Sequence, residues 1–75
     1  MKRLKLTVLW LRDHWELRGI GFSIYSHKAD AVAEGVKLGR AHLVAGGLAQ
    51  LVIRGKNGRI QSERTYGKDP RRSKG

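Results

Sequence analysis

The sequence has 75 residues, with 16 Lys and Arg against 6 Asp and Glu, a formal net charge of +10 and no cysteine. This length allows one small domain, and the lack of cysteine excludes disulfides and thiolate metal sites. The longest apolar run is far shorter than the roughly 20 residues of a membrane-spanning helix. The residues after Met1 do not form the unbroken hydrophobic segment of a signal peptide. We therefore expect a cytoplasmic protein.

The N-terminal part of the sequence predicts a β-hairpin. Apolar residues alternate with others over residues 4–12, and a period of two is typical of a strand. Residues 12–14 have turn chemistry, and the apolar pattern resumes over residues 15–24. Because isolated glycines within a strand often mark a bulge, Gly19 and Gly21 predict a kink inside a single second strand.

Residues 27–44 are predicted to form a helix. Ser26 is a suitable N-cap, and Gly46-Gly47 is a suitable stop signal. The predicted sheet-facing stripe is built of small side chains, and glycines four residues apart indicate a close approach to the strands. This stripe consists of Ala29, Val32, Val36, Gly39 and Leu43, with Ala33 and Gly35 beside it.

The segment from residue 48 to residue 63 predicts a second hairpin. Asn57-Gly58 favours a two-residue type I′ turn, since both residues tolerate a positive φ. The register that follows pairs Arg54 with Gln61 and Ile53 with Ser62. It directs Leu51, Ile53 and Ile60 to the core, and Val52, Arg54, Lys56, Arg59, Gln61 and Glu63 away from it.

These elements together predict an α+β fold of order ββαββ, in which an antiparallel sheet carries one helix packed on one face. We expect residues 1–67 to form a single domain. Residues 68–75 contain no apolar side chain to bury, so they predict a flexible basic C-terminal tail.

Four stretches of the sequence carry motifs of a known family. They are Trp15, Lys28-Ala29-Asp30-Ala31, the turn Asn57-Gly58-Arg59-Ile60, and Tyr66-Gly67-Lys68-Asp69-Pro70. Over most of the chain, they resemble the uncharacterised family called domain of unknown function 2188, found in bacteria and their phages. The hydrophobic residues 9–11 depart from the family pattern. The resemblance implies the order ββαββ and implies no activity.

Motifs for catalysis and for metal or cofactor binding are missing from the sequence. His27 and His42 are separated by about 22 Å of helix, which is too far to share a metal ion. No serine lies in a nucleophile elbow, and Gly19-Ile20-Gly21 lacks the third glycine of a dinucleotide fingerprint. We therefore expect no enzyme, no cofactor and no metal site.

The positive charge favours nucleic acid, most simply DNA, as the partner of an accessory or regulatory protein. A two-stranded ribbon can enter a major groove, and each phosphate contact adds affinity by counterion release. A solvated basic surface without a partner is the alternative. The predicted nucleic-acid-binding residues are Arg54, Lys56, Arg59, Arg64, Lys68, Arg71, Arg72 and Lys74.

A protein-interaction module is the second prediction. Leu9 and Leu11 lie on the strand face opposite Trp10, and an uncovered apolar patch of this kind is typical of an interface. The partner would be a second copy of the chain in a homodimer, or a host protein bound by a phage or mobile-element regulator. Trp10 and Trp15 are instead expected in the core, as is usual for aromatic residues in alternating strands.

Overall fold

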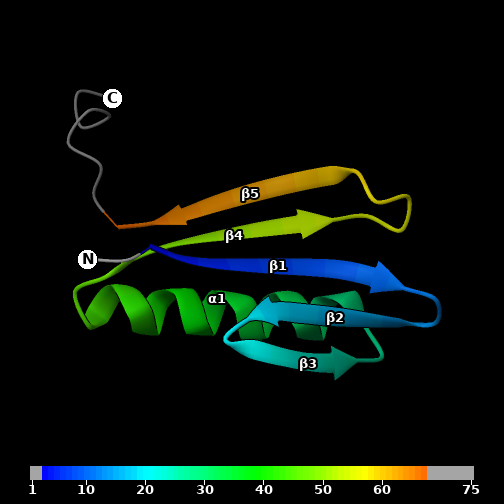
Figure 1. Cartoon of the computed structure of the whole chain (residues 1–75), viewed down its shortest axis with the longest axis horizontal. Helices are drawn as coiled ribbons and strands as arrows, with labels where there is room; N and C mark the ends of the chain where they lie inside the picture. Colours follow the sequence, from blue (N-terminus) through cyan, green and yellow to red (C-terminus); the bar gives the residue numbers. More distant parts are fainter. Residues whose placement is uncertain (1–2, 68–75) are drawn as a thin grey trace.

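The computed structural model describes residues 3–67, which form a five-stranded mixed sheet with one helix across one face (Figure 1). The order across the sheet is β3-β2-β1-β4-β5, and all neighbours are antiparallel except β1 and β4. The elements are β1 (Arg3–Leu11), β2 (His14–Gly19), β3 (Gly21–Tyr25), α1 (Lys28–Val44), β4 (Leu48–Arg54) and β5 (Ile60–Tyr66). The predicted α+β class is confirmed.

The predicted kink in one long second strand is wrong, because the chain reverses there. Gly19 and Gly21 are Cα partners in an antiparallel pair, Ile20 lies at the tip of the turn, and Gly21 has a φ of 68°. This φ suits a residue without a Cβ. Three strands therefore precede α1, and the extra reversal makes β4 run parallel to β1. The prediction of a wholly antiparallel sheet is wrong for this reason.

The core lies between α1 and the central strands. Side chains of β1, β2 and β4 alternate between this core and the opposite side of the sheet, as the period of two requires. Trp10 packs against the core and Trp15 is within it, as predicted. Among the residues that the structure describes, no helix is long and apolar enough to cross a membrane. The buried cluster consists of Leu6, Val8, Trp15, Leu17, Ala31, Leu51 and Ile53.

The helix packs on the sheet through small residues. Its buried positions are Ala31, Gly35 and Gly39, which recur every four residues and so lie on one face. The predicted close approach at the glycines is confirmed. The predicted stripe is rotated, however, because Ala29 and Leu43 at its two ends are exposed. The smallest side chains, rather than the most apolar ones, face the strands.

The two ends of α1 differ in how well they were predicted. The N-cap is His27, which makes no side-chain capping bond, so the prediction of Ser26 is wrong. At the other end, Gly46 has a φ of 94°, its N–H donates to the Leu43 carbonyl, and that of Gly47 donates to the His42 carbonyl, both at 2.9 Å. This is the Schellman arrangement, which confirms the predicted stop.

The turn between β4 and β5 is longer than predicted. The Gly58 N–H donates to the Gly55 carbonyl at 3.0 Å, with Lys56 and Asn57 between them, and Gly58 alone of these residues has a positive φ, of 84°. This pattern is typical of three-residue hairpin loops with a left-handed glycine. The predicted two-residue Asn57-Gly58 turn is therefore wrong.

The longer turn changes the register beyond it. Ile53 pairs with Ser62 as predicted, but a bulge follows and Arg54 pairs with Ile60 instead of Gln61. Ile60 therefore shares the face of Arg54 and is 50% exposed, so its predicted place in the core is wrong. The amide oxygen of Gln61 accepts a hydrogen bond from Lys28 of α1, which places Gln61 on the helix side and corrects its predicted direction as well.

Candidate nucleic-acid interface

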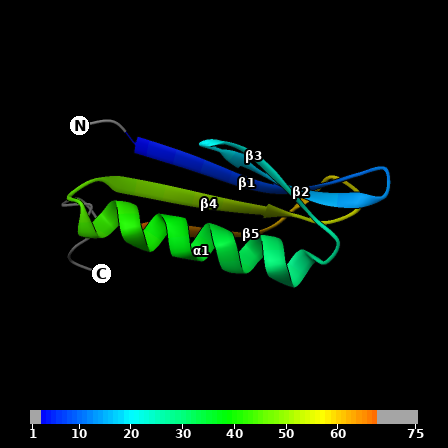
Figure 2. The same cartoon turned by 90° about the horizontal axis from the view of Figure 1, so that it is seen from below.

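The sheet face opposite α1 is here called the open face, because no element of residues 3–67 covers it (Figure 2). Because side chains alternate between the two sides of a strand, the register identifies which residues point to the open face. On β1, Arg3, Lys5, Thr7, Leu9 and Leu11 alternate with the core residues and therefore belong to it. The open face therefore carries cationic side chains on β1 as well as on the second hairpin.

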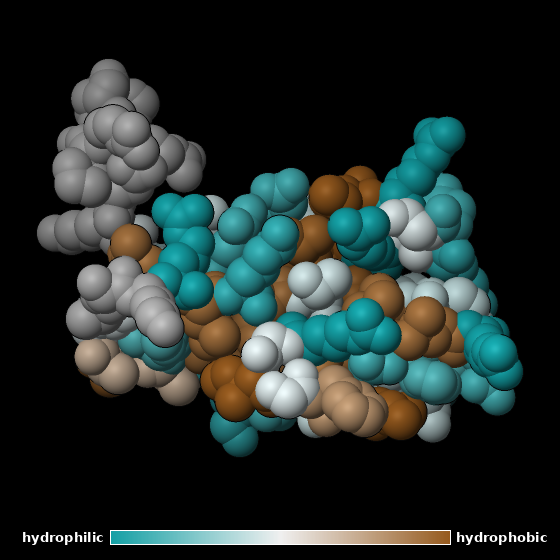
Figure 3. Space-filling model, in the orientation of Figure 1, coloured by the Kyte–Doolittle hydropathy of each residue, from teal (hydrophilic) through white to brown (hydrophobic). Residues whose placement is uncertain are grey.

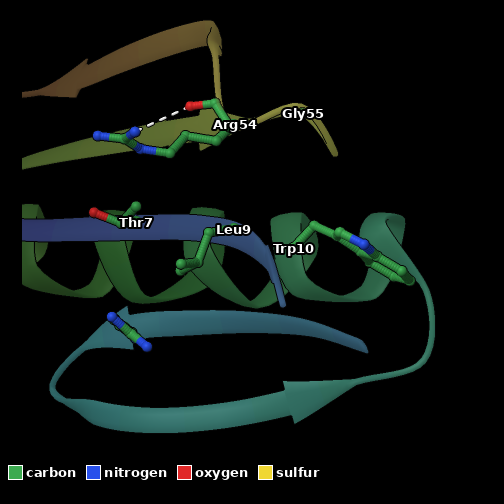
Figure 4. A pocket seen from close by; sticks show the side chains of 7 residues that line it. Thr7, Leu9, Trp10, Arg54 and Gly55 are labelled. Atoms are coloured by element: carbon green, nitrogen blue, oxygen red, sulfur yellow. Dashed lines mark hydrogen bonds between the residues drawn. The ribbon is translucent and has the colours of Figure 1, made fainter. Parts of the chain in front are cut away.

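A hollow of about 320 Å³ opens on this face, over the C-terminal half of β1 and next to the β4–β5 turn (Figure 4). Thr7 of β1 and Arg18 of β2 are Cα partners at one side of it, and Arg54 of β4 borders it from the other side. Two guanidinium groups from strands on either side of β1 therefore line one hollow. The lining residues are Thr7, Leu9, Trp10, Arg18, Arg54, Gly55 and Gly58.

The Arg54 side chain is held in place by the β4–β5 turn. Its Nη1 donates a hydrogen bond to the Gly58 carbonyl at 3.0 Å (Figure 4). A guanidinium has five N–H donors, and this bond uses one of them. The turn therefore fixes the position of the group while donors remain to face the hollow.

Arg18 is positioned by an acid on its own strand. Its Nε donates to the Glu16 carboxylate at 2.6 Å, and Glu16 is almost fully buried. The hydrogen bond from Arg18 holds the pKa of Glu16 below its usual value, although burial acts to raise it; nearby His14 lowers it further. Glu16 thus stays ionised, orients Arg18 and adds no uncompensated negative charge to the open face.

Apolar side chains lie beside these charged groups on the open face. Phe22 is the Cα partner of Arg18 and is 66% exposed, while Ile24 is the partner of Glu16. Hydrophobic residues gather along the lower edge of the molecule in Figure 3, over β3, next to hydrophilic ones. Leu9 and Leu11, predicted as a protein interface, are half-buried on the same face.

The structure separates the cations that were predicted to act together on the second hairpin. Arg54 lies on the open face, but the Lys56 ammonium lies 4.5 Å from the ring centroid of Trp10, on the core side of β1. Arg64 is the Cα partner of Leu51, which faces α1, so it belongs to the helix side. Arg59 is exposed at the end of the turn.

The remaining predicted cations lie outside the described residues. They are Lys68, Arg71, Arg72 and Lys74. The hairpin itself is not a free two-stranded ribbon, because β4 pairs with β1 on one side and with β5 on the other. Insertion of an isolated ribbon into a major groove is therefore incompatible with the sheet.

Sequence reasoning missed Arg18 and Phe22 as neighbours on one face. The local signal was the pair of glycines that flank the single residue Ile20, which suits a tight turn as well as a bulge. The alternation itself gave no sign of the reversal, because Trp15 pairs with Tyr25 and odd positions lie on the helix side in both strands. Among residues 3–67, the structure brings together no three His, Asp or Glu side chains that could hold a metal ion.

A family model described as an uncharacterized protein conserved in bacteria (DUF2188) matches residues 7–66. The chain belongs to this family. The matched segment of the DUF2188 protein begins at Thr7, includes every residue that lines the hollow, and ends with β5. No curated protein and no solved structure matches the chain. The resemblance noted in the sequence is confirmed, and the function has to be argued from the open face.

Proposed function

We propose that this DUF2188 protein is a non-enzymatic accessory protein that binds nucleic acid on its open face. The observation that carries this proposal is the position of Arg18 and Arg54 on one hollow, with Phe22 next to Arg18. Guanidinium groups form paired, charge-assisted hydrogen bonds with phosphate. Two of them on one uncovered surface favour an extended polyanion.

The charge of the chain supports a polyanionic partner. Its formal net charge is +10, and Arg3 and Lys5 extend the cationic surface along β1 from the hollow. A positive surface of this kind accelerates association with nucleic acid and releases counterions on binding. The ion pair with Glu16 offsets the charge of Arg18, so the long-range attraction depends mainly on Arg54, Arg3 and Lys5.

The shape of the face favours a single strand over a duplex. Exposed bases can stack on an aromatic side chain such as Phe22 while phosphates meet the cations, which is how sheet surfaces bind single strands. A duplex hides its bases, and β4 lies inside the sheet, so no ribbon is available for a groove. We also propose that the protein is cytoplasmic, since DNA and RNA are accessible there.

The test is fluorescence anisotropy with labelled DNA of one sequence, as a single strand and as a duplex, over a salt series. The expected result is tighter binding of the single strand and an affinity that falls as salt rises. Absence of binding at about 50 mM salt, where phosphate contacts are strong, would refute the proposal. Equal affinity for both forms would refute the preference for a single strand.

A protein-interaction module is the second candidate function. Leu9 and Leu11 favour it, because these half-buried leucines lie on a face that no described element covers. Affinity capture before and after nuclease treatment separates the two candidates. A host protein that remains bound after nuclease treatment supports this second function, and one that is lost supports binding through nucleic acid.

A further inference from the structure

The outer edge of the sheet at β3 differs from the edge at β5. The sequence of β3 is Gly-Phe-Ser-Ile-Tyr, with no charged residue and no proline. The other edge strand, β5, carries Glu63 and Arg64. Charged residues on edge strands oppose pairing with a further strand. The edge at β5 is therefore protected by charge, whereas the edge at β3 is not.

The side chains at the β3 edge are also apolar and exposed. Ile20 in the turn is 67% exposed, Phe22 is 66% exposed and Ile24 is 58% exposed. Phe22 and Ile24 lie two residues apart on β3, so they project from the same face of the strand, and Ile20 adds apolar surface at the adjoining turn. An uncharged edge strand with such exposed apolar side chains is a template for another strand.

We propose that β3 pairs with β3 of a second copy of this chain, antiparallel and around a two-fold axis at Ser23. This register places Phe22 of each copy opposite Ile24 of the other, on the open face of both. Aromatic and β-branched residues are favourable cross-strand pairs. The two five-stranded sheets then become one continuous sheet, and the interface is self-complementary, as two-fold symmetry requires.

The distribution of charge favours a second copy of the chain as the partner of β3. Two chains of charge +10 repel each other, so a contact between copies is least opposed where the strand is neutral, and β3 is neutral. Behind the interface, Arg18 is the partner of Phe22, and Glu16 is the partner of Ile24. Because Arg18 and Glu16 form an ion pair within each copy, β2 brings little net charge close to the axis.

The first test is a single cysteine at the axis. Residues directly opposite in antiparallel strands have Cα atoms about 4.5–5.5 Å apart, within the range of about 4.4–6.8 Å that a disulfide spans. The chain has no cysteine, so Ser23→Cys introduces one thiol per copy. With oxidised glutathione as the oxidant, two thiols form one interchain disulfide while glutathione is reduced.

Ser62→Cys is the matched control. Ser62 is also an exposed serine on an edge strand, and its Cα partner, Ile53, is a core residue, as Leu17 is for Ser23. The expected result is a covalent dimer for Ser23→Cys and a monomer for Ser62→Cys on a non-reducing gel. Equal cross-linking of the two variants, or none at Ser23→Cys, would overturn the proposal.

Sedimentation of the nuclease-treated protein at high salt gives a second, independent readout. Salt screens charge, so we expect the wild-type chain to remain a dimer. Ile24→Lys places a charge on β3 and should give a monomer, whereas Ile60→Lys, on the open face at the other edge, should remain a dimer. A monomeric wild-type chain at all concentrations, or dissociation by both substitutions alike, would contradict the proposal. Circular dichroism checks that each variant folds.

Discussion

Gly35 of α1 lies directly over Leu51 of β4, so that a Cβ added to Gly35 would come within 2.8 Å of Leu51 Cδ1 and 3.4 Å of Leu17 Cδ1. Leu51 is completely buried and Leu17 nearly so. A shift of either side chain would press on other core atoms, because protein cores are close-packed. The distance between helix and sheet is therefore set by the missing side chain.

Gly35→Ala is expected to destabilise the fold although alanine favours helix. The gain in helix propensity is about 1 kcal/mol, and overpacking of a core costs about 1–3 kcal/mol, so the net loss should be on the order of 1 kcal/mol. Urea denaturation measures the free energy of unfolding. Ala33→Gly, at an exposed position of α1, calibrates the propensity; a more stable Gly35→Ala would contradict the tight contact.

The β4–β5 turn makes a separate prediction at Gly58, whose φ is 84°. Gly58→Ala should lower the free energy of unfolding by about 1–2 kcal/mol, the cost of a left-handed conformation for an ordinary residue. Gly58→Asn should lose less, since asparagine tolerates this conformation. Thermal denaturation of both variants checks the order. Equal losses of stability for the two variants would contradict a left-handed conformation at Gly58.

Local signals in the sequence predicted the helix and the strands with their approximate bounds, except that β2 and β3 were predicted as one strand. The period of two in residues 4–12, the glycines after residue 45 and the pair Leu51 and Ile53 were each interpreted correctly, because each depends on neighbouring residues alone. The close approach of α1 followed from the cost of a glycine in a helix. These features do not require knowledge of which strands meet.

Topology and the site could not be obtained in the same way, because each depends on a single turn. Because Gly19 and Gly21 were interpreted as a kink, one reversal of the chain was not predicted. The direction of β4 relative to β1 was therefore predicted as antiparallel instead of parallel. One additional residue in the β4–β5 turn moved Ile60 to the open face, since a shift of one residue changes the side on which a side chain lies. Arg18 and Arg54 line the same hollow because β2 and β4 lie on either side of β1. Local patterns do not encode this strand order.

The pair formed by Glu16 and Arg18 predicts a pH dependence of stability. The folded-state pKa of Glu16 is lowered from 4.5, so its ionised form stabilises the fold above the unfolded-state pKa, and this contribution is lost as the pH falls through the lowered folded-state value. Glu16→Gln should therefore lower the free energy of unfolding near neutral pH and have a smaller effect in acid. Urea denaturation of both proteins over acidic and neutral pH measures the difference, which should shrink below about pH 4.5; a constant difference would exclude this linkage.

The two arginines of the hollow should contribute to DNA binding through phosphate. Arg54→Gln should weaken single-strand binding and reduce the slope of log affinity against log salt by about 0.7, the value for one phosphate contact. Arg18→Gln should also weaken binding, both by loss of a phosphate contact and because it leaves the Glu16 carboxylate unpaired on the open face. Arg40→Gln removes the same charge from an exposed position on α1 and should leave the slope nearly unchanged. Equal effects of all three substitutions would indicate that only net charge matters, which would exclude the hollow as the contact.

Phe22 should contribute through stacking and not through charge. Phe22→Leu keeps an apolar side chain at the β3 edge but removes the aromatic ring, so single-strand affinity should fall at least about fivefold, which corresponds to about 1 kcal/mol per stacked base. Phe22→Tyr retains the ring and should bind like the wild-type protein. Neither substitution alters the number of phosphate contacts, so the salt slope should be the same in all three proteins. Anisotropy titrations with single-stranded DNA measure both quantities, and an unchanged affinity of Phe22→Leu would show that bases do not stack at this position.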